Sequence, residues 1–165
     1  MKPKRIFLHH SASTFGTVLD INEWHLKRGF NKIGYHFVIL NGIICPRQIE
    51  PWPFLNGIVQ PGRPIDDNDD LEIWEMGAGV RGYNLDSLHI CMIGNSKYTD
   101  EQLLAAKTLI AYFCNRYDIY PNGGVFGHKE IDEGKPLCPS LDMNFFREFL
   151  VDLCSLKRLK EESET

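Results

Sequence analysis

Three short runs of β-forming residues constrain the fold of this chain more than any other feature. They cover residues 5–9, 34–40 and 88–93, and each has the length and residue types of a buried strand. We therefore expect the three runs to pair in one core sheet. With 165 residues, the chain is long enough for one ordinary domain and too short for two, so a single domain is predicted over residues 1–165.

The segment between the first two runs predicts a helix. Thr17 and Asp20 have the spacing of a capping box, in which two polar side chains satisfy free backbone N–H groups at a helix start. Apolar residues follow on one helical face. We expect a helix over about residues 18–28, ended by Gly29.

Two further helices are predicted in the second half of the chain. Thr99 and Gln102 form a full capping box, and apolar residues recur behind it at spacings of three and four. A last amphipathic stretch opens near Asp142 and should pack on the sheet. Its charged end, over about residues 157–165, is expected to fray.

Residues 45–77 are predicted to form a long loop insertion. Five prolines and an acidic run at 66–70 prevent a regular central strand or helix through most of it. The sequence Leu-Asn-Gly-Ile at 40–43 recurs at 55–58, which leaves two similar hairpins or a small local duplication as alternatives. The acidic run lacks the Gly and terminal Glu of a calcium loop, so we expect a solvated surface.

Charge and hydropathy exclude several partners. Eighteen Lys and Arg against 22 Asp and Glu give a net charge of −4, whereas proteins that neutralise nucleic-acid phosphates are usually basic. No apolar run approaches the roughly 18 to 20 residues of a membrane span. The apolar run at residues 6–8 is far shorter than the core of a signal peptide. We expect synthesis in the cytoplasm without a signal peptide, no nucleic-acid partner and no membrane insertion.

The cysteines are odd in number and widely spaced, so a complete set of intramolecular disulfides is impossible. Reduced thiols are expected. No C-x-x-C pair is present, so any metal site must be assembled from distant parts of the chain. The five cysteines are Cys45, Cys91, Cys114, Cys138 and Cys154.

Histidine and cysteine side chains suggest such a metal site. His9 and His10 are adjacent on a predicted strand and point to opposite faces, so only one of them can join a given site. His128 and Cys138 lie ten residues apart in a loop that contains Gly and Pro and that could bend both toward one point. Two histidines and one cysteine would leave a fourth position for water, which is the pattern of catalytic zinc.

A series of short motifs follows along the chain in the order of a known family. They are Ile6-Phe7-Leu8-His9-His10-Ser11-Ala12, Trp24-His25, Gly34-Tyr35-His36-Phe37, Arg81-Gly82-Tyr83-Asn84 with Ser87, Ile93-Gly94, Tyr98-Thr99 with Gln102-Leu103, and His128 through Cys138-Pro139-Ser140. In these motifs, which span residues 6 to about 150, the chain resembles the zinc-dependent N-acetylmuramoyl-L-alanine amidases. That family includes bacteriophage amidase lysozymes and animal peptidoglycan recognition proteins.

The resemblance implies an α/β fold with a central mixed β-sheet flanked by helices and one zinc ion per chain in a surface groove. Carried over by motif, His9, His128 and Cys138 would hold the zinc. Tyr35 would lie beside the zinc-bound water, and Lys135 matches the lysine before the Cys-Pro pair. Both could stabilise the oxyanion of amide hydrolysis, which is worth about 3 to 4 kcal/mol for a well-placed donor.

The sequence departs from the family pattern at two positions. Lys135 stands three residues before Cys138, whereas the phage enzymes usually have one residue between the two, so the loop must bulge for the lysine to reach the site. Gly79 stands where the family commonly has a histidine, so a substrate contact is missing or comes from the long loop.

Substrate contacts are predicted from the same motifs and from that loop. Arg81 and Asn84 belong to the Arg-Gly-Tyr-Asn motif and are expected to bind substrate. Trp52, Phe54 and Trp74 are candidates to extend the groove. Equally, these aromatic residues could only attach the loop to the core.

The leading functional hypothesis is therefore a zinc hydrolase that degrades the bacterial cell wall by cleaving the amide between N-acetylmuramic acid and L-alanine. A phage endolysin acting on the host wall is favoured over a cytoplasmic bacterial recycling amidase. A non-catalytic peptidoglycan-binding module is the other alternative, although Cys138 argues for catalysis. We expect a monomer that binds peptidoglycan or muropeptides. Some phage relatives also bind an RNA polymerase, but no surface in this sequence identifies such a partner.

Overall fold

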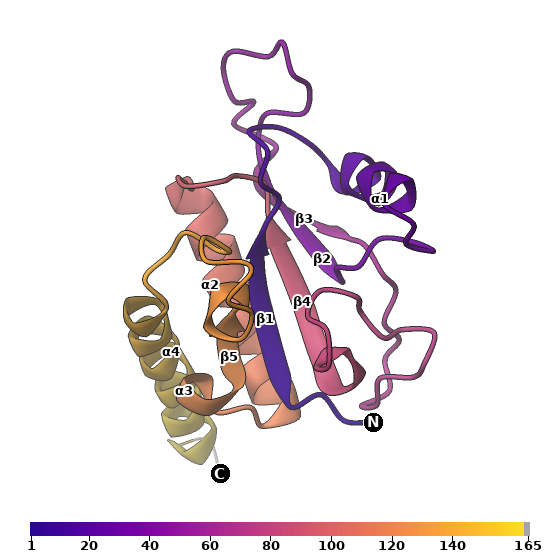
Figure 1. Ribbon diagram of the computed structural model, residues 1–165. Coiled ribbons are helices and arrows are strands. Elements are labelled where there is room, and N and C mark those ends of the chain that lie inside the picture. The colour runs from indigo at the N-terminus through magenta and orange to yellow at the C-terminus, as the bar shows by residue number, and fades with distance from the viewer. Residues whose placement is uncertain (164–165) are drawn as a thin grey trace.

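A mixed five-stranded sheet forms the centre of the computed structural model, which describes the backbone of residues 1–163 and side chains as far as residue 154 (Figure 1). The strand order is β3-β2-β4-β1-β5. β1 pairs in parallel with both β4 and β5, β2 pairs in parallel with β4, and β3 is antiparallel to β2. The strands are β1 (Arg5–His10), β2 (Phe37–Asn41), β3 (Asn56–Pro61), β4 (Ser87–Met92) and β5 (Val125–Gly127).

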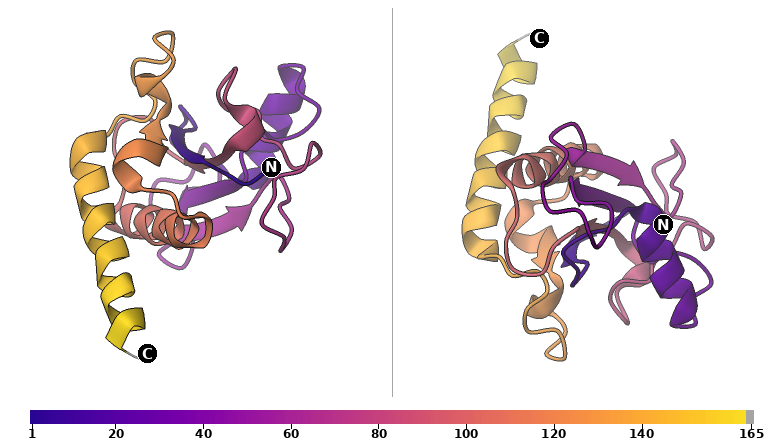
Figure 2. Two further views of the ribbon diagram at one scale, coloured as in Figure 1. Left: turned by 90° about the horizontal axis from the view of Figure 1, so that it is seen from below. Right: turned by 90° about the horizontal axis from the view of Figure 1, so that it is seen from above.

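Helices cover both faces of this sheet (Figure 2). α2 and α4 pack on one face and against each other, and α1 lies on the opposite side. None of the helices among the described residues has the length and apolar content to cross a membrane. The helices are α1 (Val18–Lys27), α2 (Asp100–Tyr117), α3 (Pro121–Gly124) and α4 (Met143–Ser163), with short 3-10 turns η1 (Asn84–Asp86) and η2 (His128–Glu130). The α/β class and the helix-flanked mixed sheet are thus confirmed.

Both predicted capping boxes are present. Thr17 accepts from the backbone N–H of Asp20, and the Asp20 carboxylate accepts from the backbone N–H of Thr17. Thr99 and Gln102 make the same reciprocal pair at the start of α2. The buried side-chain amide of Gln102 also donates to the carbonyls of Ile39 and Ile93, so this helix start is attached to the ends of two strands.

Alternation along the strands divides the core into two clusters. Ile6 and Leu8 of β1 point toward α2 and α4, in the larger cluster. Phe7 and His9 point to the other face, because successive residues of a strand alternate. A smaller cluster on that face joins Ile21 of α1 to β2. The functional residues therefore have to be sought on the face opposite α2.

The predicted loop insertion over 45–77 needs one correction. It contains β3, which is an edge strand, so the prolines exclude only a central strand there. The two Leu-Asn-Gly-Ile copies do not form two separate hairpins, because Asn41 pairs with Asn56 across β2 and β3. Each Asn is followed by a glycine with positive φ, 81° at Gly42 and 79° at Gly57. Residues between them project beyond the sheet at the top of Figure 1.

Two buried charged residues order the rest of that insertion. Arg63 donates to the carbonyls of Ile33 and Met76, at 2.9 and 2.6 Å. The Glu75 carboxylate is fully buried and accepts backbone N–H groups of Asp66 and Glu72. These contacts attach the irregular part of the insertion to the rest of the fold.

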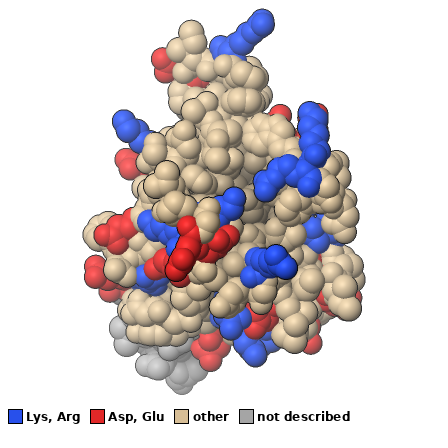
Figure 3. Space-filling model, viewed as in Figure 1, with Lys and Arg blue, Asp and Glu red and all other residues tan. Residues whose placement is uncertain are grey.

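Charged side chains occur over the surface in both signs. Figure 3 shows basic and acidic residues interspersed among uncharged ones on the face seen in Figure 1. At the C-terminal end the backbone is helical as far as Ser163. The frayed end predicted over 157–165 lies outside the residues whose side chains the structure describes.

Candidate metal centre and groove

His9, near the end of β1, is the first residue of the site. Its side chain is fully buried on the face opposite α2. His10 points away, as the strand alternation predicts, and its Nδ1 lies 3.0 Å from the carbonyl oxygen of Asn95. Only His9 of this pair reaches the metal cluster.

β5 brings His128 to His9. Leu8 of β1 pairs with Gly127 of β5, so the residue that follows β5 emerges beside the end of β1. The Glu130 carboxylate accepts the backbone N–H of Gly127 and both terminal nitrogens of Arg147 on α4, at 2.8 to 2.9 Å. This partly buried ion pair holds the 3-10 turn that carries His128 against α4.

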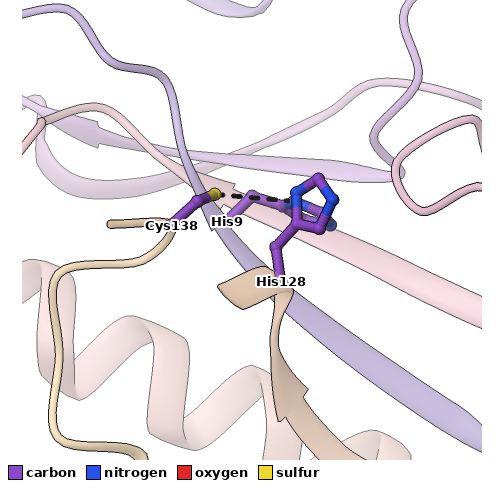
Figure 4. A group of neighbouring side chains, drawn as sticks. All are labelled: His9, His128 and Cys138. Atoms are coloured by element: carbon purple, nitrogen blue, oxygen red, sulfur yellow. Dashed lines mark hydrogen bonds between the residues drawn. The ribbon is translucent and has the colours of Figure 1, made fainter. Parts of the chain in front are cut away.

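Cys138 completes a cluster of three buried ligand groups (Figure 4). Nδ1 of His9 lies 3.2 Å from Nδ1 of His128 and 3.9 Å from Sγ of Cys138. All three ligand atoms lie within 4.8 Å of one another. Tetrahedral zinc with ordinary bond lengths separates two nitrogens by about 3.3 Å and a nitrogen from a sulfur by about 3.6 Å. The two separations from His9 are therefore close to those of a tetrahedral site, and the three ligand groups converge on one point.

The protonation of these groups also suits a metal. Burial, and then the neighbouring His89 and His128 rings, lower the pKa of His9 well below its ordinary value. Burial likewise lowers the pKa of His128. Both rings are thus neutral near pH 7, with lone pairs for a cation. Burial raises the pKa of the Cys138 thiol, so an incoming metal has to displace its proton.

Each histidine of the cluster has a partner for its other ring nitrogen. Nε2 of His128 lies 3.3 Å from a carboxylate oxygen of Asp132. Nε2 of His9 lies 3.1 Å from Nδ1 of the buried His89 on β4. Such outer partners orient metal-binding histidines. The sequence reasoning missed both, although the four-residue spacing from His128 to Asp132 and a histidine inside an apolar strand were visible signals.

Tyr35 lies beside the cluster. Its ring centroid is 4.9 Å from that of His9 and 5.1 Å from that of His25 on α1. Burial raises the pKa of Tyr35, which keeps the phenol protonated as a hydrogen-bond donor near neutral pH. The ring also faces the groove described below.

Lys135 lies in a turn that brings it back toward the cluster. Its backbone N–H donates to the carbonyl of Asp132, and its carbonyl accepts from the N–H of Cys138, at 2.9 and 3.0 Å. The side chain is exposed and lines the groove. Lys129 is directed elsewhere, because its ammonium donates to the carbonyl of Leu141 at 2.6 Å. The turn supplies the bulge that the altered spacing before Cys138 requires.

A groove of about 450 Å³ opens over the metal cluster. Its lining includes His128 and Cys138 of the cluster together with Trp24 and His25 of α1. The predicted substrate residues Arg81 and Asn84 both line it. The amide oxygen of Asn84 accepts the backbone N–H groups of Gly79 and Val80, so this residue also holds the groove wall in place.

The two predicted tryptophans lie away from this lining. Trp52 is stacked on Phe54, with ring centroids 5.7 Å apart, in the projecting segment between β2 and β3. The indole N–H of Trp74 donates to the carboxylate of Glu72. Both are about half exposed.

Comparison with known sequences places this site in a family. The sequence model of N-acetylmuramoyl-L-alanine amidases matches residues 1–140. The endolysin of Escherichia phage T7 is 26% identical over 150 residues, which cover 84% of this chain and 81% of the relative. A peptidoglycan-recognition protein of Drosophila melanogaster is 30% identical over 146 residues, which cover 78% of this chain and 65% of the relative.

Solved structures have the same fold. The N-acetylmuramoyl-L-alanine amidase LysC from Clostridium intestinale superposes with a TM-score of 0.69 and 25% identity, over 91% of this chain and 86% of that one. Drosophila PGRP-LB superposes with a TM-score of 0.60 and 25% identity, over 84% of this chain and 75% of that one. Amidases and recognition proteins of the same family are thus both similar to this chain.

Proposed function

The chain belongs to the N-acetylmuramoyl-L-alanine amidase family, and from this we propose that it is an endolysin whose metal is one zinc ion held by His9, His128 and Cys138. Its substrate would be peptidoglycan, cleaved at the amide between N-acetylmuramic acid and L-alanine. The observation that carries the proposal is the convergence of three buried ligand groups, two histidines and a cysteine, within 4.8 Å of one another. Its presence favours an enzyme over a module that only binds the wall.

The chain's own groups prepare the site for that ion. Neutral His9 and His128 present lone pairs, and the Cys138 thiol becomes an anionic ligand when it gives up its proton. A zinc ion bound there would acidify a water molecule and polarise the amide carbonyl. The Asp132 carboxylate beside Nε2 of His128 favours the ring form that offers Nδ1 to the cluster.

Tyr35 and Lys135 are the donors proposed to act on the substrate. Hydrolysis places negative charge on the carbonyl oxygen, and a donor aimed at that oxygen binds it more strongly as the charge grows. The protonated Tyr35 phenol stands beside His9, and the Lys135 ammonium reaches the groove from the turn before Cys138.

The charges of the groove suit a peptide stem that carries carboxylates. Arg28, Arg81 and Lys135 line it, and Asp132 is the one acidic side chain that the described residues contribute to the lining. An excess of positive charge attracts anionic substrates into such a cleft. Arg81 and Asn84 remain the proposed substrate contacts next to the reacting bond.

Digestion of purified peptidoglycan tests the function directly. Mass spectrometry of the products should find free stem peptides with L-alanine at their amino end, together with glycan strands that have no new reducing ends. The same protein after zinc removal by a chelator is the control, and re-addition of zinc should restore the products. New reducing sugar ends as the main product would refute the amidase assignment.

A further inference from the structure

We propose that His89 is a positioning residue for the metal site. Its Nδ1 accepts a hydrogen bond from Nε2–H of His9, and this bond leaves the bare Nδ1 of His9 directed toward the metal. This inference rests on the proposed function, because it assigns a role to a neighbour of the proposed ligand. Nothing in the motif pattern pointed to residue 89.

The geometry of the two rings carries the proposal. His89 lies on β4 and is fully buried. In the parallel pairing of β4 with β1 it stands opposite Phe7, so its side chain shares the sheet face of Phe7 and His9. Nδ1 of His89 is 3.1 Å from Nε2 of His9, while Nδ1 of His9 is 3.2 Å from the corresponding atom of His128. The two nitrogens of His9 thus face two different partners.

Proton counting then fixes the direction of the hydrogen bond. A neutral imidazole has one N–H and one bare nitrogen. If Nδ1 of His9 is to bind a metal, its proton must be on Nε2, and Nδ1 of His89 must accept it. His89 then carries its own proton on Nε2, a buried atom that has no hydrogen-bond partner among the described residues. The hydrogen bond that orients His9 therefore leaves one buried N–H of His89 unpaired, which is energetically unfavourable.

The His89 ring is held so that it cannot turn away. It stacks between Phe7, at a centroid distance of 5.6 Å, and His36, at 5.8 Å. Its backbone N–H donates to Nδ1 of His36 at 2.9 Å, and Nε2 of His36 in turn lies 3.0 Å from the carbonyl of Glu75. The plane of the acceptor is therefore set by packing on both sides.

Gly77 and Gly79 let the backbone of their segment pack directly against the His9–His89 hydrogen bond. A Cβ at Gly79 would lie 2.4 Å from Nδ1 of His89 and 2.9 Å from Nε2 of His9. A Cβ at Gly77 would lie 2.3 Å from Cδ2 of His89. No side chain fits at either position while His89 keeps its place. A histidine side chain at position 79 therefore has no room beside His89.

A matched pair of substitutions tests the role. His89→Asn places an amide oxygen near the position of Nδ1 and keeps an acceptor, whereas His89→Leu has a similar branched shape and no acceptor. Zinc affinity of each variant, measured by competition with a chromophoric chelator, is the readout. His89→Leu should bind zinc about 10- to 100-fold more weakly than the parent, as for other lost outer partners, and His89→Asn should retain most of the affinity.

The outcomes separate this inference from the proposed function. A parent protein that binds no zinc overturns the proposed metal site. If the parent binds zinc and His89→Leu binds it with the same affinity, the positioning role alone is overturned. The same holds if both variants lose zinc affinity to the same extent. Nitrogen NMR of the zinc-loaded parent labelled in histidine gives a second measurement that needs no variant to fold. It should find the His89 proton on Nε2, and a proton on Nδ1 would contradict the proposal.

Discussion

The sulfur of Cys138 lies 3.9 Å from Nδ1 of His9, although 129 positions separate the two residues in the sequence. The backbone N–H of His10 also donates to this sulfur, at 3.4 Å. One strand therefore provides both the imidazole beside the thiol and a donor that favours the thiolate. A metal bound here would join the loop after β5 to β1, an interior strand of the sheet, and it would contribute to stability as well as to chemistry.

Replacing Cys138 by Ser should weaken zinc binding by more than the roughly 10- to 100-fold expected for loss of an outer hydrogen bond. The reason is that a serine hydroxyl is a poor substitute for a soft anionic thiolate. Metal content after dialysis against a chelator measures the effect. Cys45→Ser, at an exposed loop position, is the matched control and should keep its zinc. Equal retention by both variants would remove Cys138 from the ligand set.

Tyr35→Phe should keep zinc bound and lower turnover by about 100- to 1,000-fold, the usual effect of losing one oxyanion donor. The substitution removes only the hydroxyl, so the ring contacts with His9 and His25 remain. Steady-state release of stem peptides at matched zinc content is the measurement. Tyr120→Phe, at an exposed position remote from the groove lining, should be unchanged. Unchanged turnover in Tyr35→Phe would exclude the phenol as a donor.

Lys135→Ala should also retain zinc, because the ammonium is not a proposed ligand. Its turnover should fall by a factor similar to that expected for Tyr35→Phe. Lys107→Ala on α2, on the other face of the sheet, controls for loss of a positive charge. Full activity of Lys135→Ala at full zinc occupancy would show that the altered spacing has moved this lysine out of the site. Arg81, which lines the same groove, would then be the first donor to test.

Buried histidines predict that the protein loses stability in mild acid. Burial lowers the pKa of both His25 and His36 to about 4 from an ordinary 6.5. The unfolded chain therefore takes up protons first, and the stability present above pH 6.5 falls as the pH drops toward 4. Each histidine contributes up to about 1.4 kcal/mol per pH unit. The decline should occur between the ordinary pKa of 6.5 and the lowered pKa of about 4. The free energy of unfolding in urea, measured at several values from roughly pH 7.5 to pH 4.5, should show it.

A variant isolates one of these contributions. Nδ1 of His25 accepts the backbone N–H of Gly34 at 2.9 Å, and the amide oxygen of His25→Asn can replace that acceptor without titrating. The slope of unfolding free energy against pH should be shallower in this variant than in the parent. Identical slopes would mean that His25 does not couple folding to protons.

The elements with strong local signals were predicted from the sequence. The three β-rich runs correspond to β1, β2 and β4, and the two capping boxes mark the starts of α1 and α2. β5 was not predicted, because three residues carry too little periodicity to be distinguished from a loop. β3 was hidden by its prolines, which an edge strand tolerates.

The site was predicted in part. His9, His128 and Cys138 were identified by motif order and residue type, and the structure brings them together. His89 was overlooked, although it interrupts an apolar strand, because its role depends on strand register. Sequence alone does not give the register that places it opposite Phe7.

The position of β1 between β4 and β5 has a consequence for how the protein is made. β1 precedes the other strands of the sheet in the chain, yet its two sheet neighbours begin at Ser87 and Val125. Contacts so far apart in the chain form slowly, since a long loop must close before they are gained. His9 meets its last proposed partner only when Cys138 has left the ribosome. The three proposed ligands of a nascent chain therefore cannot assemble until translation has passed residue 138.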